Sequence, residues 1–295
     1  MDLLAGLGAI FFLVLVAFLV KKKARDGISA TAPEKNKQLF LLAGWLVAYN
    51  WVLAFANNRF GWDQGILATY FFVPTVVATT FKPRGKRWDG LVDLFLICWM
   101  WIPNDFGLKI IFSTWGGGAL GYCLTVLTGM TYILILFTGW RNIDFKLDWS
   151  LTKRDCVWIV SAYFILAVLV IPPALAVGFI HPGIIKNPVK AALSPFIWFA
   201  PALVEELIFR GVIQRAMIKW LRPVAGIVAS AIIFGFSHLD NKAGDYRYPN
   251  WRYVFFASIA GVVYGLVCHK RNLQSSVTVH FLVDFTWVIL FRGGK

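Results

Sequence analysis

Six ionisable side chains lie inside long apolar stretches of this 295-residue chain. A charged side chain at the centre of a bilayer costs about 2.5–3.5 kcal/mol on insertion scales, so residues of this kind are functional candidates. Five of the six fall within the last hundred residues, which concentrates the candidate chemistry toward the C-terminus. In chain order they are Asp93, Glu205, Glu206, His238, His280 and Asp284.

Two adjacent glutamates form the first group. On a helix, Glu206 and Arg210 are i,i+4 neighbours, which predicts an ion pair that keeps Glu206 ionised. Glu205 points about 100° away from Glu206 and remains available for another task. A desolvated carboxylate that lacks a cation retains a proton more readily, which suits a general base. The alternative interpretation is that both glutamates only bridge helices.

Two histidines provide the second and third groups. His238 ends the sequence Phe-Gly-Phe-Ser-His, which begins at Phe234. His280 and Asp284 are one helical turn apart, so the carboxylate can orient the imidazole or share a site with it. A single histidine in a membrane helix usually forms a packed hydrogen bond between helices. Two histidines together with a glutamate pair favour a catalytic site.

The expected helices place Glu205 and His238 at one depth. Residues 194–221 are expected to form one long helix, followed by a turn at Arg222. Glu205 lies 17 residues before Arg222 and His238 lies 16 residues after it. At about 1.5 Å per residue, the two side chains then lie at the same height in a helical hairpin. The His–Asp pair of the last span is expected nearer the cytoplasmic face.

The composition indicates which elements position these residues. Apolar residues make up 59% of the chain and charged residues 15%, with a mean hydropathy of +0.67. Ordinary soluble domains are about 45–50% apolar and about 25% charged, so a soluble enzyme is excluded. The fold class predicted is all-α, a polytopic membrane helix bundle with about 8–10 transmembrane helices. The spans expected are 3–20, 39–56, 66–80, 90–103, 118–139, 156–178, 191–209, 224–239, 252–268 and 275–291, of which 66–80 and 90–103 are short enough to be tilted, re-entrant or interfacial.

The chain has a net charge of +14, and the positions of its basic residues agree with the expected membrane topology. With the N-terminus outside, 20 of the 29 Lys and Arg residues fall in cytoplasmic segments, as the positive-inside rule requires. We therefore expect contact with anionic lipids and no nucleic-acid binding. Because the basic cluster at 21–25 follows the first span, that span is expected to be an anchor and not a signal peptide. The chain has no Asn-x-Ser/Thr sequon, which favours a prokaryotic plasma membrane.

The polar stretch 140–155 predicts a boundary between two regions. Residues 1–150 form a membrane-helix region to which the sequence assigns no role. Residues 151–295 carry five of the six candidate side chains.

The three groups, in this order, resemble the CPBP (CAAX protease and bacteriocin-processing) family of intramembrane proteases, which includes the prenyl-protein endopeptidases. The resemblance covers roughly residues 190–290. It implies an intramembrane endopeptidase that hydrolyses a peptide bond of a membrane-anchored or lipidated substrate, either CAAX-type or a precursor. The family pattern of Glu-Glu-x-x-x-Arg, Phe-x-x-x-His and His-x-x-x-Asn/Asp matches at Glu205, Glu206, Arg210, Phe234, His238, His280 and Asp284.

Two mechanisms fit these residues. In the first, Glu205 and His238 activate water without a metal, and His280 with residue 284 stabilises the oxyanion, as the resemblance implies. In the second, His238, His280 and a glutamate bind Zn²⁺, whose bound water ionises near neutral pH. An ionised Asp284 cannot donate to an oxyanion, so Asp284 is either protonated in its apolar site or orients His280 instead, and we expect the second. The chain lacks a His-Glu-x-x-His motif, which favours the metal-free route.

Two other functions use the same side chains. A proton-coupled transporter could relay protons through the Glu and His residues, but it would more naturally show paired repeats, and none is evident. A catalytically silent family member is the second, and the complete motif set argues against it.

Overall fold

The computed structural model describes the greater part of the chain. Two expected spans, 3–20 and the beginning of 191–209, fall outside the described residues. The described residues are 35–56, 61, 63–84, 87–103, 119–145, 147, 149–183, 199, 201–241 and 248–293.

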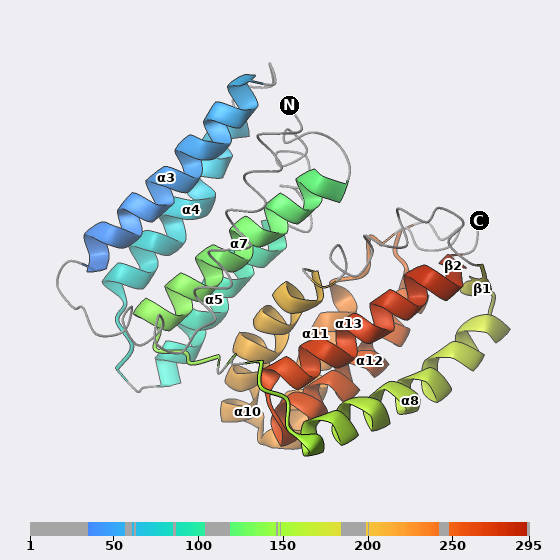
Figure 1. Cartoon of the computed structure of the whole chain (residues 1–295). Helices are drawn as coiled ribbons and strands as arrows, with labels where there is room; N and C mark the ends of the chain where they lie inside the picture. The colour runs from blue at the N-terminus through green and yellow to red at the C-terminus, as the bar shows by residue number, and fades with distance from the viewer. Residues whose placement is uncertain are drawn as a thin grey trace. The chain divides into compact units, whose positions relative to one another are not determined.

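The chain divides into two compact units, residues 1–148 and residues 149–295. In the first unit, α4 packs against α3, α5 and α7 (Figure 1). Four predicted spans, including the two short ones, are therefore confirmed as helices. Their bounds are α3 (Lys35–Ala56), α4 (Asp63–Thr80), α5 (Arg87–Pro103) and α7 (Ala119–Trp140).

Asp93, the candidate farthest from the others in sequence, has a partner inside the first unit. The buried Arg141 donates from Nε to Asp93 Oδ1 at 2.5 Å. The same guanidinium donates to the carbonyl oxygen of Phe81 and, at 3.1 Å, to that of Asp89. Arg141 follows α7, Phe81 follows α4 and Asp89 lies in α5. The Asp93 carboxylate therefore helps to join three helix ends, which is a packing role.

The second unit contains the other five candidates. Its helix α11 packs mainly against α12, and α13 packs against α12 and α8 (Figure 1). Residues 201–206 are α-helical and continue directly into a π-helical segment, η3. The remaining bounds are α8 (Lys153–Ala176), β1 (Ile180–Pro182), η3 (Leu207–Gln214), α10 (Arg215–Leu221), α11 (Pro223–Phe236), α12 (Trp251–Lys270), α13 (Leu273–Leu290) and β2 (Phe291–Gly293).

The fold class predicted from composition is confirmed as an all-α membrane bundle. Within the described ranges, α8, α12 and α13 are long and apolar enough to cross a membrane. Shorter apolar stretches within α4, α7 and α11 accompany them: Gln64–Thr80, Thr131–Trp140 and Pro223–Phe236. The strands found are β1 and β2, which form one short antiparallel pair. The total of about 8–10 crossings stays a prediction.

Helix α8 is attached to α13 along its whole length. Near its start, the Asp155 carboxylate accepts hydrogen bonds from Arg271 Nε at 2.8 Å and Asn272 Nδ2 at 3.1 Å, just before α13 begins. In the middle, the hydroxyls of Tyr163 and Thr286 lie 2.8 Å apart. At the far end, β1 after α8 pairs with β2 after α13. The two helices therefore form one wall.

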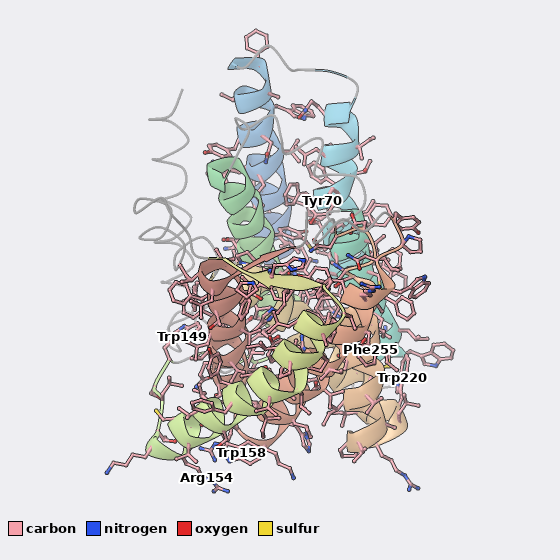
Figure 2. All side chains as sticks on the ribbon, turned by 90° about the vertical axis from the view of Figure 1, so that its right-hand side faces the viewer. Tyr70, Trp149, Arg154, Trp158, Trp220 and Phe255 are labelled. Carbon is pink, nitrogen blue, oxygen red and sulfur yellow. The ribbon has the colours of Figure 1, made fainter. Side chains whose placement is uncertain are left out.

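The start of α8 is capped by its own sequence. Thr152 Oγ accepts from the Asp155 backbone N–H, and the Asp155 carboxylate accepts from the Thr152 N–H, which is a capping box. Figure 2 places Arg154 and Trp158 close together at this end of the helix. A cation beside an aromatic ring is typical of a helix end at a membrane interface.

Two glycines bring α11 and α12 into close contact. A Cβ on Gly235 would lie 2.0 Å from Ser258 Oγ, and one on Gly261 would lie 3.1 Å from Ala231 Cβ. Glycine at both positions lets the backbones approach, as small residues do in membrane helix pairs. The turn expected at Arg222 is confirmed, since α10 ends at Leu221 and α11 begins one residue after Arg222.

Candidate active site

Glu206 is fully buried and firmly held. Its Oε1 lies 2.9 Å from an Arg210 Nη, which confirms the predicted i,i+4 ion pair. Its Oε2 accepts a hydrogen bond from Ser276 Oγ at 2.5 Å. Arg210 also donates to the Gly261 carbonyl oxygen at 3.1 Å. A buried charge needs a close partner and further hydrogen bonds, and Glu206 has both.

The helix that carries this pair differs from the expected one. The sequence predicts one continuous α-helix over 194–221, whereas residues 207–214 of it form the π-helical segment η3. Every residue of η3 is buried, because the segment packs against α11, α12 and α13. A π-helical turn of this kind is frequent at functional sites.

The Arg210 guanidinium lies among aromatic rings. It is 4.4 Å from the centroid of the Phe234 ring and 5.2 Å from that of Tyr264. Both distances are within the range of cation–π attraction. Phe234 is on α11 and Tyr264 on α12, so one cation links η3 to two neighbouring helices.

His280 is the central side chain of the cluster. Its Nδ1 lies 3.0 Å from Glu206 Oε1. Its Nε2 lies 3.5 Å from Asp284 Oδ2 and 3.7 Å from Glu205 Oε2. Both ring nitrogens thus face carboxylate oxygens, and each must carry a proton in order to donate toward them. The predicted proximity of His280 and Asp284 is confirmed, but Glu206 makes the shorter contact, which the sequence did not predict.

Glu205 differs from its neighbour in exposure. Its side chain is 31% exposed, whereas that of Glu206 is 0% exposed. The sequence predicts that the two carboxylates lie on different sides of the helix. In the structure, Glu206 faces Nδ1 of His280 and Glu205 faces Nε2. Glu205 is therefore the more exposed glutamate of the pair, although its Oε2, which faces His280, is enclosed by protein atoms.

His238 is oriented by the helix that it follows. Its Nδ1 lies 3.0 Å from the Phe234 carbonyl oxygen and 3.0 Å from Ser237 Oγ. A carbonyl oxygen only accepts, so this geometry assigns the proton to Nδ1 and leaves Nε2 as the basic nitrogen. The ring packs against Phe234 at 4.9 Å and Tyr253 at 4.7 Å between centroids.

A cavity of about 410 Å³ joins the two histidines. His238, His280 and Asp284 all line it. Both imidazoles contact the Phe234 ring, so the difference in depth expected from the sequence does not separate them. The rest of the wall is largely aromatic and aliphatic and includes Tyr163, Leu166, Val170, Tyr253, Phe256, Tyr264 and Trp287.

Two residues of the cluster were missed by the sequence reasoning, Ser276 and Tyr264. Ser276 lies four residues before His280, so both side chains face Glu206 from one side of α13. That spacing is a usable signal. Tyr264 stacks on His280 with centroids 4.6 Å apart and 20° between the planes, and nothing in its local sequence indicates this contact.

The donor set of the zinc mechanism is not assembled in this structure. Across the described ranges, no group of three or more His, Cys, Asp or Glu side chains is arranged to hold a metal ion. Within the described ranges, the residues that the zinc mechanism requires therefore do not form a preformed metal site.

Comparison with known proteins gives one match. Residues 187–286 match a family described as type II CAAX prenyl endopeptidase, Rce1-like. No curated protein and no solved structure matches the chain. The matched range contains all five candidates of the second unit and Arg210, and it leaves out α8 and the first unit.

Proposed function

Residues 187–286 are a domain of the Rce1-like, type II CAAX prenyl endopeptidase family, and from this premise we propose that Glu205 and His238 activate water for peptide hydrolysis within the membrane. The resemblance seen in the three motifs is confirmed for this part of the chain. The protein is thus an integral membrane protein of the CAAX-type intramembrane protease class.

The observation that carries the mechanism is the different placement of the two glutamates. Glu206 is enclosed by Arg210, Ser276 and His280 and has no access to water. Glu205 is partly exposed beside the same imidazole. A general base must reach the water that it deprotonates, so Glu205 fits that role and Glu206 fits a positioning role.

The reaction then proceeds as follows. Glu205 takes a proton from water, with His238 Nε2 orienting the water, and the oxygen attacks the carbonyl carbon of the scissile bond. The carbonyl electron pair moves to oxygen, where the His280 Nε2–H stabilises it. The C–N bond breaks as Glu205 gives the proton that it took from water to the departing nitrogen, which leaves a carboxylate and an amine. The 3.5 and 3.7 Å separations around Nε2 exceed ordinary hydrogen bonds and leave it able to turn to a substrate oxygen.

The proposed substrate is a membrane-anchored or lipidated peptide. CAAX proteases act in general on membrane-anchored prenylated proteins. The aromatic and aliphatic wall supports this class, because apolar cavity walls bury apolar ligand surface. Helices α8, α12 and α13, which supply most of the wall, are also the candidate spans.

The test uses the full-length protein in lipid vesicles with a farnesylated peptide substrate, and mass spectrometry detects the released fragment. We expect Glu205→Gln and His238→Ala each to lower kcat by roughly 10²-fold or more while abundance stays normal. Asp89→Asn, the same chemical change in the first unit, is the control and should retain activity.

Unchanged cleavage by Glu205→Gln would contradict the proposed mechanism. A chelator added to the same assay tests the zinc alternative. Activity that is lost on chelation and restored only by Zn²⁺ would favour the zinc mechanism over the metal-free one.

A further inference from the structure

Tyr264 lines the cavity of the candidate site, and its phenolic hydroxyl has no hydrogen-bond partner among the described residues. The side chain lines the cavity beside His280 and Asp284. Another tyrosine of the cavity wall, Tyr163, instead has its hydroxyl 2.8 Å from that of Thr286. The Tyr264 hydroxyl makes no hydrogen bond within the described part of the chain, and it is not among the polar atoms that protein atoms seal off completely. A donor is therefore available at the cavity wall.

The ring that carries this hydroxyl is held on several sides. Tyr264 is 2% exposed, stacks on His280 at 4.6 Å and has the Arg210 guanidinium 5.2 Å from its centroid. Its own carbonyl oxygen lies 2.9 Å from Ser276 Oγ, which also fixes Glu206. The hydroxyl thus needs little reorganisation when charge develops near it, which is the property of an effective oxyanion donor.

The aspartate at position 284 leaves the oxyanion with one hydrogen-bond donor fewer than an asparagine there would supply. The family pattern allows Asn or Asp at this position, and an Asn amide donates hydrogen bonds to an oxyanion. An ionised Asp284 only accepts, so the oxyanion has the His280 Nε2–H as its one donor among the motif residues. Tetrahedral intermediates of acyl transfer are commonly stabilised by two donors or more.

We propose that Tyr264 is a catalytic residue that donates its phenolic O–H to the oxyanion, in place of the amide that Asp284 lacks. When the Glu205-activated water attacks, the carbonyl electron pair moves to oxygen, and that oxygen accepts hydrogen bonds from Tyr264 Oη–H and His280 Nε2–H. The phenolic proton stays on Tyr264 throughout. When the C–N bond breaks, the pair returns to the carbonyl and both hydrogen bonds relax. This assignment rests on the proposed function and deepens it.

The first test is Tyr264→Phe in the full-length protein in vesicles, with the farnesylated peptide. The substitution keeps the ring, and with it the stacking on His280, and removes only the hydroxyl. We expect kcat to fall by roughly 10²-fold, KM to change by less than about threefold, and abundance and thermal unfolding to stay as in wild type. The matched control is Tyr248→Phe, at an exposed tyrosine that does not line the cavity.

The second test separates donation from packing. Asp284→Asn supplies an amide donor, so the loss caused by Tyr264→Phe should shrink to roughly tenfold or less in that background. Equal kcat for Tyr264→Phe and wild type, or the same loss in both backgrounds, would overturn the assignment. If Tyr264→Phe is fully active while Glu205→Gln is inactive, the assignment fails and the proposed function stands. Cleavage that survives Glu205→Gln overturns both.

Discussion

Adjacent glutamates on one helix have different surroundings in this protein. Glu206 is within 3.0 Å of Arg210, Ser276 and His280, whereas the Glu205 side chain is partly exposed. In the proposed mechanism, two identical side chains therefore have two roles, Glu205 as the base and Glu206 as the residue that holds the imidazole. The division follows from burial and partners and not from residue type.

The residue-scale prediction is that Glu206→Gln acts on stability. The amide leaves Arg210 buried without a counter-charge, and removing one partner of a buried pair costs roughly 3–5 kcal/mol. We expect lower abundance and a lower Tm for Glu206→Gln, measured by expression in membranes and by thermal unfolding. Glu205→Gln is the matched control, since it is the same substitution one residue away and should unfold at the wild-type temperature. Equal Tm values for the two variants would contradict the division of roles.

At the scale of elements, α8 belongs to the site although it lies outside the matched residues 187–286. It supplies Tyr163, Leu166 and Val170 to the cavity wall. The attachments at Asp155, at Tyr163 and through β1 fix its position relative to α13, which carries His280. One wall of the cavity is therefore formed by a helix that lies outside the residues matched by the family.

The element-scale prediction is that Asp155→Asn weakens this attachment and lowers activity. The carboxylate accepts from Arg271 and Asn272 at the turn into α13 and from the Thr152 backbone, and an amide cannot replace all of these bonds. Hydrogen bonds to charged groups contribute about 1.5–3 kcal/mol each, so Tm should fall, and kcat should fall with it as His280 loses its fixed position. Arg154→Gln, at the exposed neighbouring residue, is the control. Normal Tm and kcat for Asp155→Asn would show that the attachment does not position the helix that carries His280.

At the scale of the whole molecule, the sequence predicted what short-range spacing determines. The helices, the turn at Arg222 and the Glu206–Arg210 pair all follow from local pattern. The contact of Glu206 with His280 joins residues 74 positions apart, and the stacking of Tyr264 on His280 depends on how α12 meets α13. The packing role of Asp93 likewise required knowing that Arg141 ends up beside it. Spacing along one helix is encoded locally, whereas contacts between helices depend on crossing geometry, which a single sequence does not specify.

The orientation of the protein in the membrane is the last prediction. The excess of Lys and Arg in the expected cytoplasmic segments predicts that the start of α8 is on the cytoplasmic side and the loop between α11 and α12 is outside. Cys156 is exposed at that start, so it reports the side directly. In a variant with Cys156 as the sole cysteine, a membrane-impermeant thiol reagent should label inverted vesicles and spare intact cells. Tyr248→Cys in a cysteine-free background, at an exposed residue of the α11–α12 loop, should give the opposite pattern. Labelling of Cys156 from outside would reverse the orientation and place the basic turns, together with the Asp155 attachment, on the outer face.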